Sequence, residues 1–494
     1  MALHLSKSKY CMAVQCPKML WLKSHMPELF DDSVMNQAVL DTGTEVGDLA
    51  MGLLGPYTEV EFGDLSKMVT DTRRLLEEGV SVITEASFSY HGLFCSVDLL
   101  KVVDQKTVEL YEVKSSTEIS DIYYHDAAYQ YYVLTNLGFQ VQKVCLVHID
   151  KTYVRQGALD IEKLFKINDI TDAAKQLYSD VDERIRLLSS IIQDDKEPAE
   201  GLDMHCFQPY PCGFFSYCSK DLPSPNVFNI AGMQTKSKVK YYKRGLSSFE
   251  DLEHETKLNL GCLMQIDHEL HDIPDYIDRK SIHDFLNGLS YPLYFLDFES
   301  YQSAIPLYDN SKPYEQIVFQ YSLHYIERED GTLKHKEYLA YPGEDPRRKL
   351  AERLCSDIPE NCCVLAYNMS FEKGRIKGLA ELYPDLKEKL LRINTQIQDL
   401  MVPFRQKLYY TRAMQGSYSI KYVLPALFPD DPSLNYHNLE EIHNGAEASS
   451  AFIQMQSMNP DQIEQYRDYL LKYCGLDTFA MVKIWEKLLE VSRL

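Results

Sequence analysis

The sequence lacks any long hydrophobic run. No stretch of about 18 apolar residues occurs in the 494-residue chain, so no membrane span is expected. The N-terminal stretch has no apolar run followed by a small-residue cleavage site, so we expect no signal peptide and a cytoplasmic location. No segment resembles a Walker phosphate-binding loop. Any ATP-driven strand separation would therefore need a partner chain, such as a helicase or a defence or repair protein.

The chain also lacks an excess of basic charge. Lys and Arg number 51 and Asp and Glu 73, which gives a net charge of −22 at pH 7. The whole molecule is therefore not attracted to nucleic acid, and such contacts would have to use local basic patches or metal ions held by carboxylates. One basic and aromatic segment could follow a phosphate backbone and stack on bases, or could be a solvated helix face: Lys236, Lys238, Lys240, Tyr241, Tyr242, Lys243 and Arg244.

A chain of 494 residues is expected to form two or three domains. Helical patterns over 34–53 and 160–200 flank β-rich segments at 81–90, 93–103 and 107–116, a helix at 121–137 and a strand at 142–150. This order predicts an α/β domain with one sheet over residues 1–225. Residues 226–288 are expected to form a helical connector. Residues 289–494 are expected to form a second α/β domain, which begins with strands at 291–300, 316–327 and 334–341.

Carboxylates gather on the predicted strands of the first domain. Asp98 lies on one strand, and Glu112 and Lys114 lie on the next, where alternate residues share a face. Glu85, on the preceding strand, and Gln130, on the following helix, could reach the same end. Such a hard oxygen site suits Mg²⁺, which would activate a water, while Lys114 would position that water or stabilise charge on a phosphate. The alternative is a surface salt bridge between Glu112 and Lys114, although charges on apolar inner strands need a reason.

Twelve cysteines without an expected signal peptide indicate a reducing compartment. Cys206, Cys212 and Cys218 share a loop rich in Pro, Gly and aromatic residues, in which no regular structure is expected. With Cys16 as the fourth ligand, or Cys11 as its competitor, four thiolates suit Zn²⁺ or an iron–sulfur cluster. The trio contains no Cys-x-x-Cys pair, which favours the cluster. The alternative is three unligated thiols.

Taken in order, these residues resemble the RecB-like PD-(D/E)XK nucleases, above all the iron–sulfur branch with the CRISPR-associated exonucleases and AddB-type nucleases. The resemblance covers about residues 1–225 and rests on Cys16, Glu85, Asp98, Glu112-Val113-Lys114, Gln130, Cys206, Cys212 and Cys218. It implies a restriction-endonuclease-like fold, a [4Fe–4S] cluster on the four cysteines, and Mg²⁺ or Mn²⁺ at Asp98 and Glu112. Many relatives have Cys-x-x-Cys in the downstream trio, whereas this chain does not, which keeps Cys11 as an alternative ligand.

A second set of acids, with one tyrosine, lies in residues 289–494: Asp297, Glu299, Glu372, Tyr473 and Asp477. The first two acids share one face of a predicted strand, and the last two residues lie one turn apart on a predicted helix. Three or four carboxylates that converge on a strand end could hold two metal ions, with the tyrosine orienting the attacking water. The alternatives are that each acid is a cap or a surface charge, and that Asp399 replaces Glu372.

These motifs resemble the DEDD exonucleases of the ribonuclease H-like superfamily. The tyrosine-type form is preferred because Lys472 stands where a histidine-type enzyme has His. The resemblance covers about residues 290–494 and implies metal ligation by Asp297, Glu299 and Asp477. Glu372 departs from the aspartate of the family. The two halves together resemble a bacterial family of predicted nucleases.

The expectation is therefore a metal-dependent nuclease with two separate active sites. It would hydrolyse phosphodiester bonds at single-stranded ends of nucleic acid, DNA in preference to RNA, with no membrane partner. The alternative function is a nucleic-acid-binding scaffold with a structural iron–sulfur cluster and only one live site.

Overall fold

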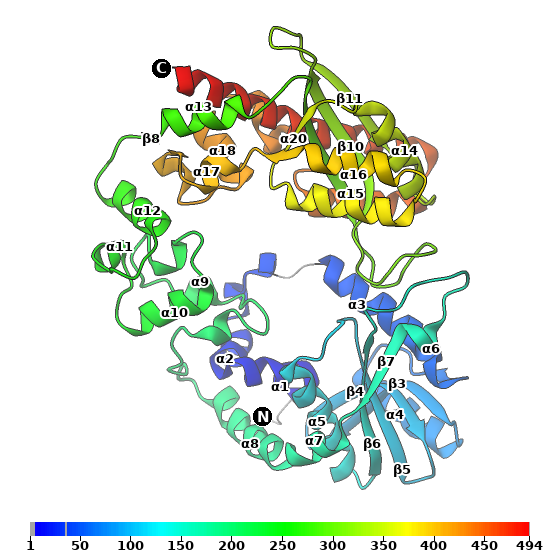
Figure 1. The fold of residues 1–494 in the computed structure, drawn as a ribbon. Helices are drawn as coiled ribbons and strands as arrows, with labels where there is room; N and C mark the ends of the chain where they lie inside the picture. The colour runs from blue at the N-terminus through cyan, green and yellow to red at the C-terminus, as the bar shows by residue number, and fades with distance from the viewer. Residues whose placement is uncertain (1–4, 35–36, 494) are drawn as a thin grey trace. The chain divides into compact units, whose positions relative to one another are not determined.

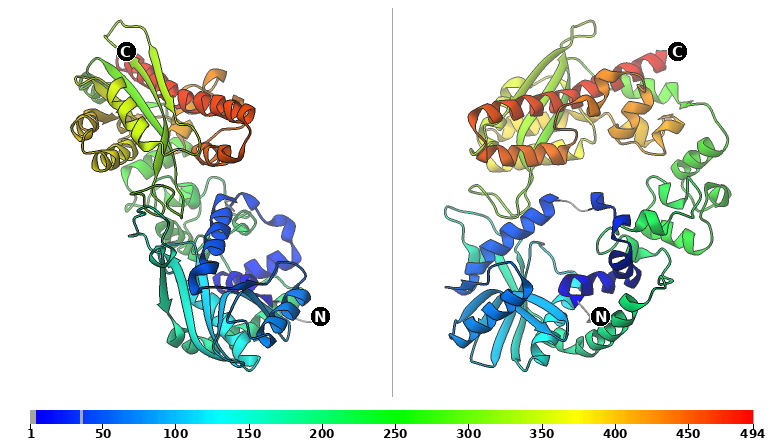
Figure 2. Two further views of the ribbon diagram at one scale, coloured as in Figure 1. Left: turned by 90° about the vertical axis from the view of Figure 1, so that its right-hand side faces the viewer. Right: turned by 180° about the vertical axis from the view of Figure 1, so that it is seen from behind.

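The computed structural model describes residues 5–34 and 37–493. The chain divides into two compact units, one made of Met1–Leu222 with Ser303–Tyr314 and the other of Pro223–Gln302 with Glu315–Leu494. Each unit has its own sheet and its own helices (Figure 1; Figure 2), which confirms the predicted α/β class. No helix within the described ranges combines the length and the apolar composition that crossing a bilayer requires.

The first unit is built on a seven-stranded sheet: β1 Leu5–Ser6, β2 Thr58–Glu59, β3 Val82–Tyr90, β4 Leu93–Val102, β5 Thr107–Lys114, β6 Gln140–Ile149 and β7 Phe165–Asp169. The predicted meander is confirmed, since β3, β4 and β5 pair antiparallel in sequence order. The predicted helix follows as α5 (Asp121–Asn136) and leads to β6, which pairs parallel with β5. The short strand β1 lies parallel beside the start of β4.

Helices bury one face of this sheet. α5 packs Ala127, Ala128 and Val133 into the core of the unit. Tyr10 of α1 stacks on Tyr129 of α5 with ring centroids 4.9 Å apart. Besides α5, the α-helices of the unit are α1 Lys7–Gln15, α2 Pro17–His25, α3 Gln37–Ala50, α4 Leu65–Glu77, α6 Ile161–Leu164, α7 Thr171–Gln176, α8 Tyr178–Gln193 and α9 Phe215–Cys218.

Three predictions for this unit need correction. The single helix over 160–200 is wrong, because β7 pairs antiparallel with β6 inside that range. An edge strand carries as much surface charge as an exposed helix, so charge density did not distinguish them. The helix over 34–53 begins at Gln37 and ends at Ala50, with residues 35 and 36 outside the described residues. The cysteine loop contains one helical turn at Phe215–Cys218 and a 3₁₀ turn at Met204–Cys206.

The second unit is built on a five-stranded sheet: β9 Leu293–Tyr301, β10 Ile317–Ile326, β11 Lys334–Leu339, β12 Cys363–Ala366 and β13 Ile397–Asp399. The strand order is β11-β10-β9-β12-β13. The first three strands are antiparallel neighbours, as predicted, and β12 pairs parallel with both β9 and β13. A separate two-stranded sheet joins β8 (Tyr276–Ile277) to β14 (Tyr409–Tyr410).

The helices of the second unit cover both faces of its sheet (Figure 1). On one face, Tyr294, Leu296 and Phe298 of β9 share a core with α14, α15 and α16. On the other face, Leu293 and Phe295 share a core with α13, α18 and α20. The helices are α10 Thr235–Lys243, α11 Phe249–Leu252, α12 Leu260–Leu270, α13 Arg279–Asn287, α14 Arg347–Asp357, α15 Ser370–Leu382, α16 Lys387–Gln396, α17 Val402–Arg405, α18 Ile420–Leu427, α19 Gly445–Gln454 and α20 Pro460–Arg493.

The alternation along β9 decides where its acids point. Asp297 and Glu299 continue the series of Leu293 and Phe295, because alternate residues of a strand share a face. β12 pairs with β9 only from Leu293 to Phe295. The two acids therefore lie past the end of this pairing, on the face that α20 covers.

Candidate functional site

In the first unit, predicted acids meet where β4 and β5 stop pairing. The last paired residues are Leu99 and Tyr111, so Asp98 and Glu112 follow immediately after the final pair. The Asp98 carboxylate accepts the N–H of Val113 at 2.6 Å instead of a strand-to-strand backbone bond. The side chain of Asp98 thus fixes the strand end that carries Glu112.

Glu85 lies opposite Asp98 on the other neighbouring strand. The register of β3 and β4 passes from Thr84–Leu99 to Ala86–Val97 without a shift, so Glu85 and Asp98 stand opposite each other as the one pair that the ladder omits. The φ of Glu85, 53°, lies in the left-handed region, which is uncommon for a residue with a side chain. Burial raises the pKa of Glu85, and the charges of Lys7 and Glu112 act on it next, so Glu85 lies near the acids of β4 and β5.

Two lysines bind the acids of this site. Glu112 Oε1 accepts hydrogen bonds from Lys114 Nζ and Lys7 Nζ, both at 2.7 Å. Lys114 Nζ also donates to Asp126 Oδ2 at 2.5 Å. Lys7 Nζ lies 3.9 Å from Asp98 Oδ1 and 3.7 Å from Asp126 Oδ1. The salt bridge between Glu112 and Lys114 is real, but it belongs to a half-buried network rather than to an exposed surface.

The helix α5 supplies the remaining members of the site. Gln130 Nε2 donates to Glu112 Oε2 at 2.6 Å and lies 3.3 Å from Asp126 Oδ1. Sequence reasoning missed Asp126 and Lys7. Asp126 precedes Gln130 by one helical turn and so had to share its face, which is a signal the sequence contained. Lys7 is separated from Glu112 by 105 residues, and no local pattern connects them.

The lysines decide the charge state of this site. Glu112 is only 1% exposed, and this burial raises its pKa. Lys114 and Lys7 outweigh the burial and hold the pKa of Glu112 well below its usual range. The pKa of Asp126 is raised, by burial first and then by the charge of Glu112. The group therefore contains at least one firmly ionised carboxylate balanced by ammonium groups.

The four predicted cysteine ligands lie in one neighbourhood. Cys16 begins α2 as its N-cap residue and packs with Cys212 and Cys218 in a small apolar cluster. Burial raises the pKa of Cys16 and of Cys206 to about 11. The Cys206 thiol adds to the rise at Cys16, and the Cys212 and Cys218 thiols add to the rise at Cys206, so the four thiols act on one another.

Cys11, the competing ligand, lies elsewhere. Burial raises its pKa first, and the charges that act on it next are those of Asp126, Lys114 and Lys7. Cys11 therefore lies beside the acidic site of the first unit. The geometry brings Cys16, rather than Cys11, to the downstream trio.

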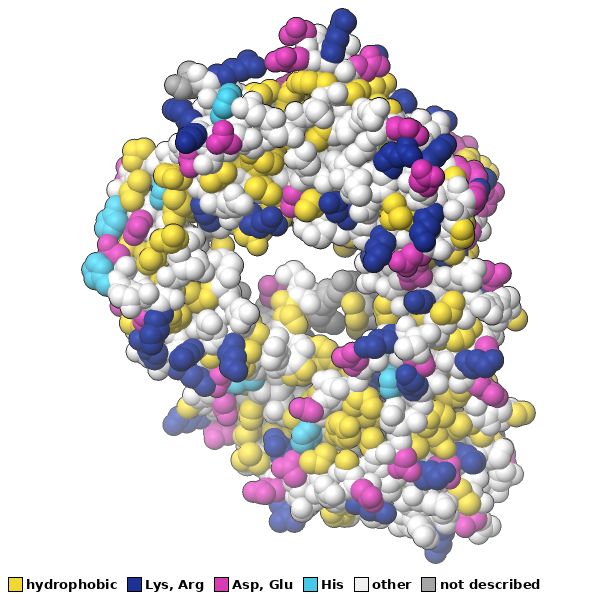
Figure 3. Space-filling model, viewed as in Figure 1, with side chains coloured by type: hydrophobic (Ala, Val, Ile, Leu, Met, Phe, Trp, Pro, Cys, Tyr) yellow, Lys and Arg dark blue, Asp and Glu magenta, His cyan; other side chains and the backbone are white. Residues whose placement is uncertain are grey.

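The basic segment over α10 is visible on the surface of the second unit as a gathering of Lys and Arg side chains (Figure 3). Lys238 is partly buried and donates to the Phe228 carbonyl at 2.8 Å, and Arg244 pairs with Glu255 at 2.9 Å. Tyr241 is buried, and Tyr242 packs against Phe228. The two tyrosines thus hold the helix in place, which favours the solvated-face interpretation over base stacking.

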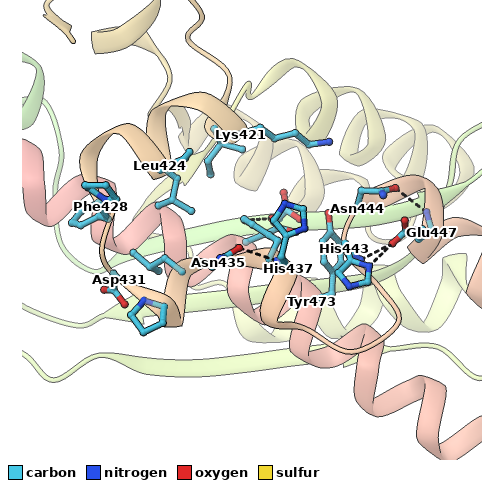
Figure 4. Close-up of a pocket in the computed structure, with 18 of the residues that line it drawn as sticks. Lys421, Leu424, Phe428, Asp431, Asn435, His437, His443, Asn444, Glu447 and Tyr473 are labelled. Carbon is cyan, nitrogen blue, oxygen red and sulfur yellow. Dashed lines mark hydrogen bonds and ion pairs between the residues drawn. The ribbon is translucent and has the colours of Figure 1, made fainter. Parts of the chain in front are cut away.

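In the second unit, Asp297, Glu299 and Asp477 line one pocket of about 1000 Å³, together with Tyr473. Figure 4 shows Lys421 and Leu424 of α18 on one wall, and His443, Asn444 and Glu447 on another beside Tyr473. Lys421 is exposed and lines this pocket.

Two acids of this pocket, Asp297 and Glu299, are close enough to share an ion. Among the described residues, the one group of three or more His, Cys, Asp or Glu side chains whose ligand atoms all lie within 4.8 Å of one another is Asp297, Glu299 and Cys474. Cys474 is fully buried, and this burial raises the pKa of its thiol far above the usual range, with the Asp297 charge adding to it. The thiol stays protonated, so the oxygen atoms are the useful ligands.

Hydroxyl groups and a helix end orient these acids. Tyr436 Oη donates to Asp477 Oδ1 at 2.6 Å, and its ring centroid lies 6.0 Å from that of Tyr473. A Cβ atom at Gly445 would lie 3.6 Å from Glu299 Oε2, so the N-terminal end of α19 approaches that carboxylate. A helix N-terminus favours negative charge. Sequence reasoning missed Tyr436, because it lies in a 3₁₀ turn without a motif of its own.

Glu372 and Asp399, the two competing acids, have different environments. Asp399 Oδ1 accepts the N–H groups of Asn368 and Met401, both at 3.0 Å, and so caps the chain around β13. Glu372 is 3% exposed, and its Oε2 has no hydrogen-bond partner within the described part of the chain. An unpartnered buried oxygen suits a ligand position. Glu372 does not, however, line the pocket with the other acids.

Repulsion dominates the electrostatics of this second site. Burial raises the pKa of Asp297 well above its usual range, and the charges of Asp477, Glu299 and Glu372 raise it further. Burial likewise raises the pKa of Asp477 to about 6, against the Tyr436 hydroxyl and the charge of Lys421. Within the described residues, none of these four acids forms a salt bridge with a Lys or Arg. These acids therefore tend to keep their protons, because no ammonium or guanidinium group of the described site residues pairs with them.

Comparison with known proteins gives partial matches. A family model described as a domain of unknown function (DUF2779) matches residues 294–419, which include Asp297, Glu299 and Glu372. The chain is 28% identical over 218 residues to "Uncharacterized protein MG366" of Mycoplasma genitalium, covering 40% of this chain and 32% of that protein. It is 28% identical over 213 residues to "Uncharacterized protein UU173" of Ureaplasma parvum serovar 3, covering 38% and 30%. The chain thus spans about a third of the length of these relatives, and no solved structure matches it.

Proposed function

We propose that the protein is a metal-dependent nuclease with one active site in each unit. The observation that carries the proposal is the convergence of Asp297, Glu299 and Asp477 on one pocket, next to Tyr473. Closely spaced carboxylates of this kind bind the divalent ions that cleave phosphodiester bonds. The strand order β11-β10-β9-β12-β13 supports a ribonuclease H-like fold for this unit, and the order of β3 to β6 supports a PD-(D/E)XK fold for the other.

At the C-terminal pocket, the oxygen ligands of Asp297, Glu299 and Asp477 suit Mg²⁺ or Mn²⁺. When bound, these ions would supply an activated water and support the leaving oxygen. Tyr436 holds the Asp477 carboxylate in place by its hydroxyl group. The hydroxyl of Tyr473 lies in the same pocket and would orient the attacking water, and Lys421 would bind a phosphate of the strand.

At the N-terminal site, Asp98 and Glu112 would bind one metal ion, with Glu85 as an outer carboxylate. Lys114 already binds Glu112, and its ammonium group would also stabilise charge that develops on the phosphate. Gln130 fixes the second oxygen of Glu112. These roles follow from the contacts of the side chains with one another.

The test is cleavage of 5′- and 3′-labelled single-stranded DNA and RNA with Mg²⁺ or Mn²⁺. We expect Lys114→Ala to remove one activity and Asp297→Ala the other, because the two sites lie in separate cores. Asp477→Asn should nearly abolish the C-terminal activity, whereas Tyr473→Phe should slow it and leave metal affinity nearly unchanged. If either single change removed all cleavage from a folded protein, the two-site model would be wrong.

For the cysteines, we propose a [4Fe–4S] cluster on Cys16, Cys206, Cys212 and Cys218. In a tetrahedral zinc site the sulfur atoms lie about 3.8 Å apart, as Zn–S distances of about 2.3 Å require. Among the described residues the four thiols do not form a group whose sulfur atoms all lie within 4.8 Å of one another, so their spacing is wider than a tetrahedral zinc site requires.

Iron content and colour test this cofactor. Protein purified without oxygen should be brown and contain iron, and Cys206→Ser should destabilise the first unit because the cluster joins distant segments. Cys11→Ser is the matched control and should retain the iron. Stoichiometric zinc without iron would refute the cluster.

The second candidate function is a nucleic-acid-binding scaffold with one live site. The position of Glu372 favours it, because this acid is buried outside the pocket that the other three line. In that case Asp297→Ala would change no cleavage rate, while Lys114→Ala would remove all of it.

A further inference from the structure

Lys7 lies where an incoming metal ion would have to bind. Glu112 Oε1 accepts from both Lys7 and Lys114, and Glu112 Oε2 accepts from Gln130. Asp98 Oδ2 is used by the Val113 N–H. An ion that joins the two acids through Asp98 Oδ1 and Glu112 Oε1 would have to take the place of an ammonium group that is already there. Those are the two oxygens that Lys7 Nζ approaches, at 3.9 Å and 2.7 Å.

The position of Lys7 is fixed by the strand that precedes it and by the helix that it begins. β1 pairs Leu5 with Leu93, and the Leu5 N–H donates to the Gly92 carbonyl at 3.1 Å. Tyr129 Oη donates to the Leu5 carbonyl at 2.5 Å. Ser6 then caps α1 by accepting the Lys9 N–H, so Lys7 is the first helical residue. The ammonium group is therefore delivered to the acids by a strand, a buried hydroxyl and a helix start.

Glu112 Oε1 does not have enough lone pairs to bind Lys7, Lys114 and a metal ion at the same time. A carboxylate oxygen has two lone-pair positions, and Lys7 and Lys114 already use both. Lys114 is held a second time by Asp126 Oδ2 at 2.5 Å. Lys7 makes its other approaches at 3.7 Å and 3.9 Å, which are too long for hydrogen bonds. Lys7 is therefore the cation that a metal ion would displace.

We propose that Lys7 is a built-in cation that competes with the divalent metal ion for Glu112 Oε1 and so lowers the metal affinity of the N-terminal site. The inference rests on the proposed metal site at Asp98 and Glu112. Without metal, Lys7 keeps the buried Glu112 paired, which allows the site to fold as a neutralised group. With metal, the ion has to replace the ammonium group at that oxygen, which costs affinity.

The test is a Mn²⁺ titration of the full chain, followed by the electron paramagnetic resonance signal of free Mn²⁺. Asp297→Asn and Asp477→Asn are present throughout, so that the C-terminal site does not contribute. Lys7→Met should tighten Mn²⁺ binding by at least about tenfold, since it removes a unit charge next to the ion. Lys7→Gln serves the same purpose if the methionine variant does not fold, and Lys7→Arg should bind Mn²⁺ as the parent does.

Lys9→Met is the matched control, because it removes the same charge from an exposed position of the same helix. It should change Mn²⁺ affinity less than about twofold, since exposed charges are screened. Equal tightening by Lys9→Met or by Lys7→Arg would overturn the proposal, as would unchanged or weaker binding by both Lys7→Met and Lys7→Gln. Tightened binding in a protein that cleaves no labelled strand would uphold this inference and refute nuclease activity at the N-terminal site. Cleavage by the N-terminal site, together with unchanged Mn²⁺ affinity in Lys7→Met, would support the nuclease and overturn this inference.

Discussion

The two acidic sites of this protein have similar residues and opposite electrostatics. In the first unit, Lys7 and Lys114 donate directly to Glu112 and hold its pKa well below the usual range, against the effect of burial. In the second unit, burial and mutual repulsion raise the pKa values of Asp297 and Glu299 well above theirs. Among the residues that the structure describes, hydroxyl groups, the Cys474 thiol and the pocket lysine Lys421 act against this repulsion.

The difference shows two ways of keeping carboxylates buried before a metal ion arrives. Ammonium groups can neutralise the acids, in which case the ion must compete with them. Alternatively the acids can remain unbalanced and hold protons, in which case the ion must replace the protons. The same substitution, acid to amide, should therefore have opposite effects on the stability of the two units.

The largest effect is expected for Glu112→Gln. This change leaves Lys7 and Lys114 partly buried without their shared partner, and breaking a buried pair in this way costs about 3–5 kcal/mol. Denaturant unfolding of the first unit should show the loss. Glu118→Gln, which breaks an exposed pair with Lys151, is the control and should cost little stability, because solvent screens such a pair. Equal losses of stability in both variants would mean that the buried network stabilises the protein no more than an exposed ion pair does.

A smaller effect, dependent on pH, is expected for Glu372→Gln. Burial raises the pKa of Glu372 to about 8, above the 4.5 expected in the unfolded chain. The folded state therefore keeps a proton that the unfolded state has lost between these values, so stability falls as pH rises from about 4.5 to about 8. The free energy of unfolding of Glu372→Gln should not fall in this way, so the variant should exceed the wild type by up to about 4 kcal/mol.

Unfolding free energies of the second unit at pH 5 and pH 8 measure the Glu372 effect. Wild type and Glu372→Gln should agree at pH 5 and diverge at pH 8, where the variant is more stable. Divergence at pH 5 alone would show that the sign is wrong.

The smallest effect is expected for Asp297→Asn in metal-free protein at pH 8. At pH 8 the unfolded chain has released the Asp297 proton, whereas burial and the charges of Asp477 and Glu299 oppose its release in the folded protein, so the amide should stabilise the second unit by about 1–3 kcal/mol. Thermal unfolding without and with Mn²⁺ provides the measurement, because Mn²⁺ should stabilise the wild type more than the variant. Glu329→Gln, at an exposed position, should leave both values unchanged. A destabilised Asp297→Asn protein would remove the contrast between the two sites.

Local patterns predicted much of the fold and part of each site. Strand alternation placed Glu112 with Lys114 and Asp297 with Glu299, because a period of two residues is a property of the extended backbone itself. Charge density failed at 160–200, since an exposed edge strand and an exposed helix have the same composition. The helical period also contained Asp126, one turn before Gln130, although the motif alone did not single it out.

The sequence by itself determined most of the segments that form strands and helices, and which acids share a face, because these depend on neighbours a few residues apart. Only the tertiary structure decided which partners reach those acids. Lys7 arrives at Glu112 from 105 residues away, and Tyr436 arrives at Asp477 from 41 residues away. The strand pairings and helix packing that bring them together depend on the register of the whole sheet. The charge of each site therefore follows from contacts that no local pattern specifies.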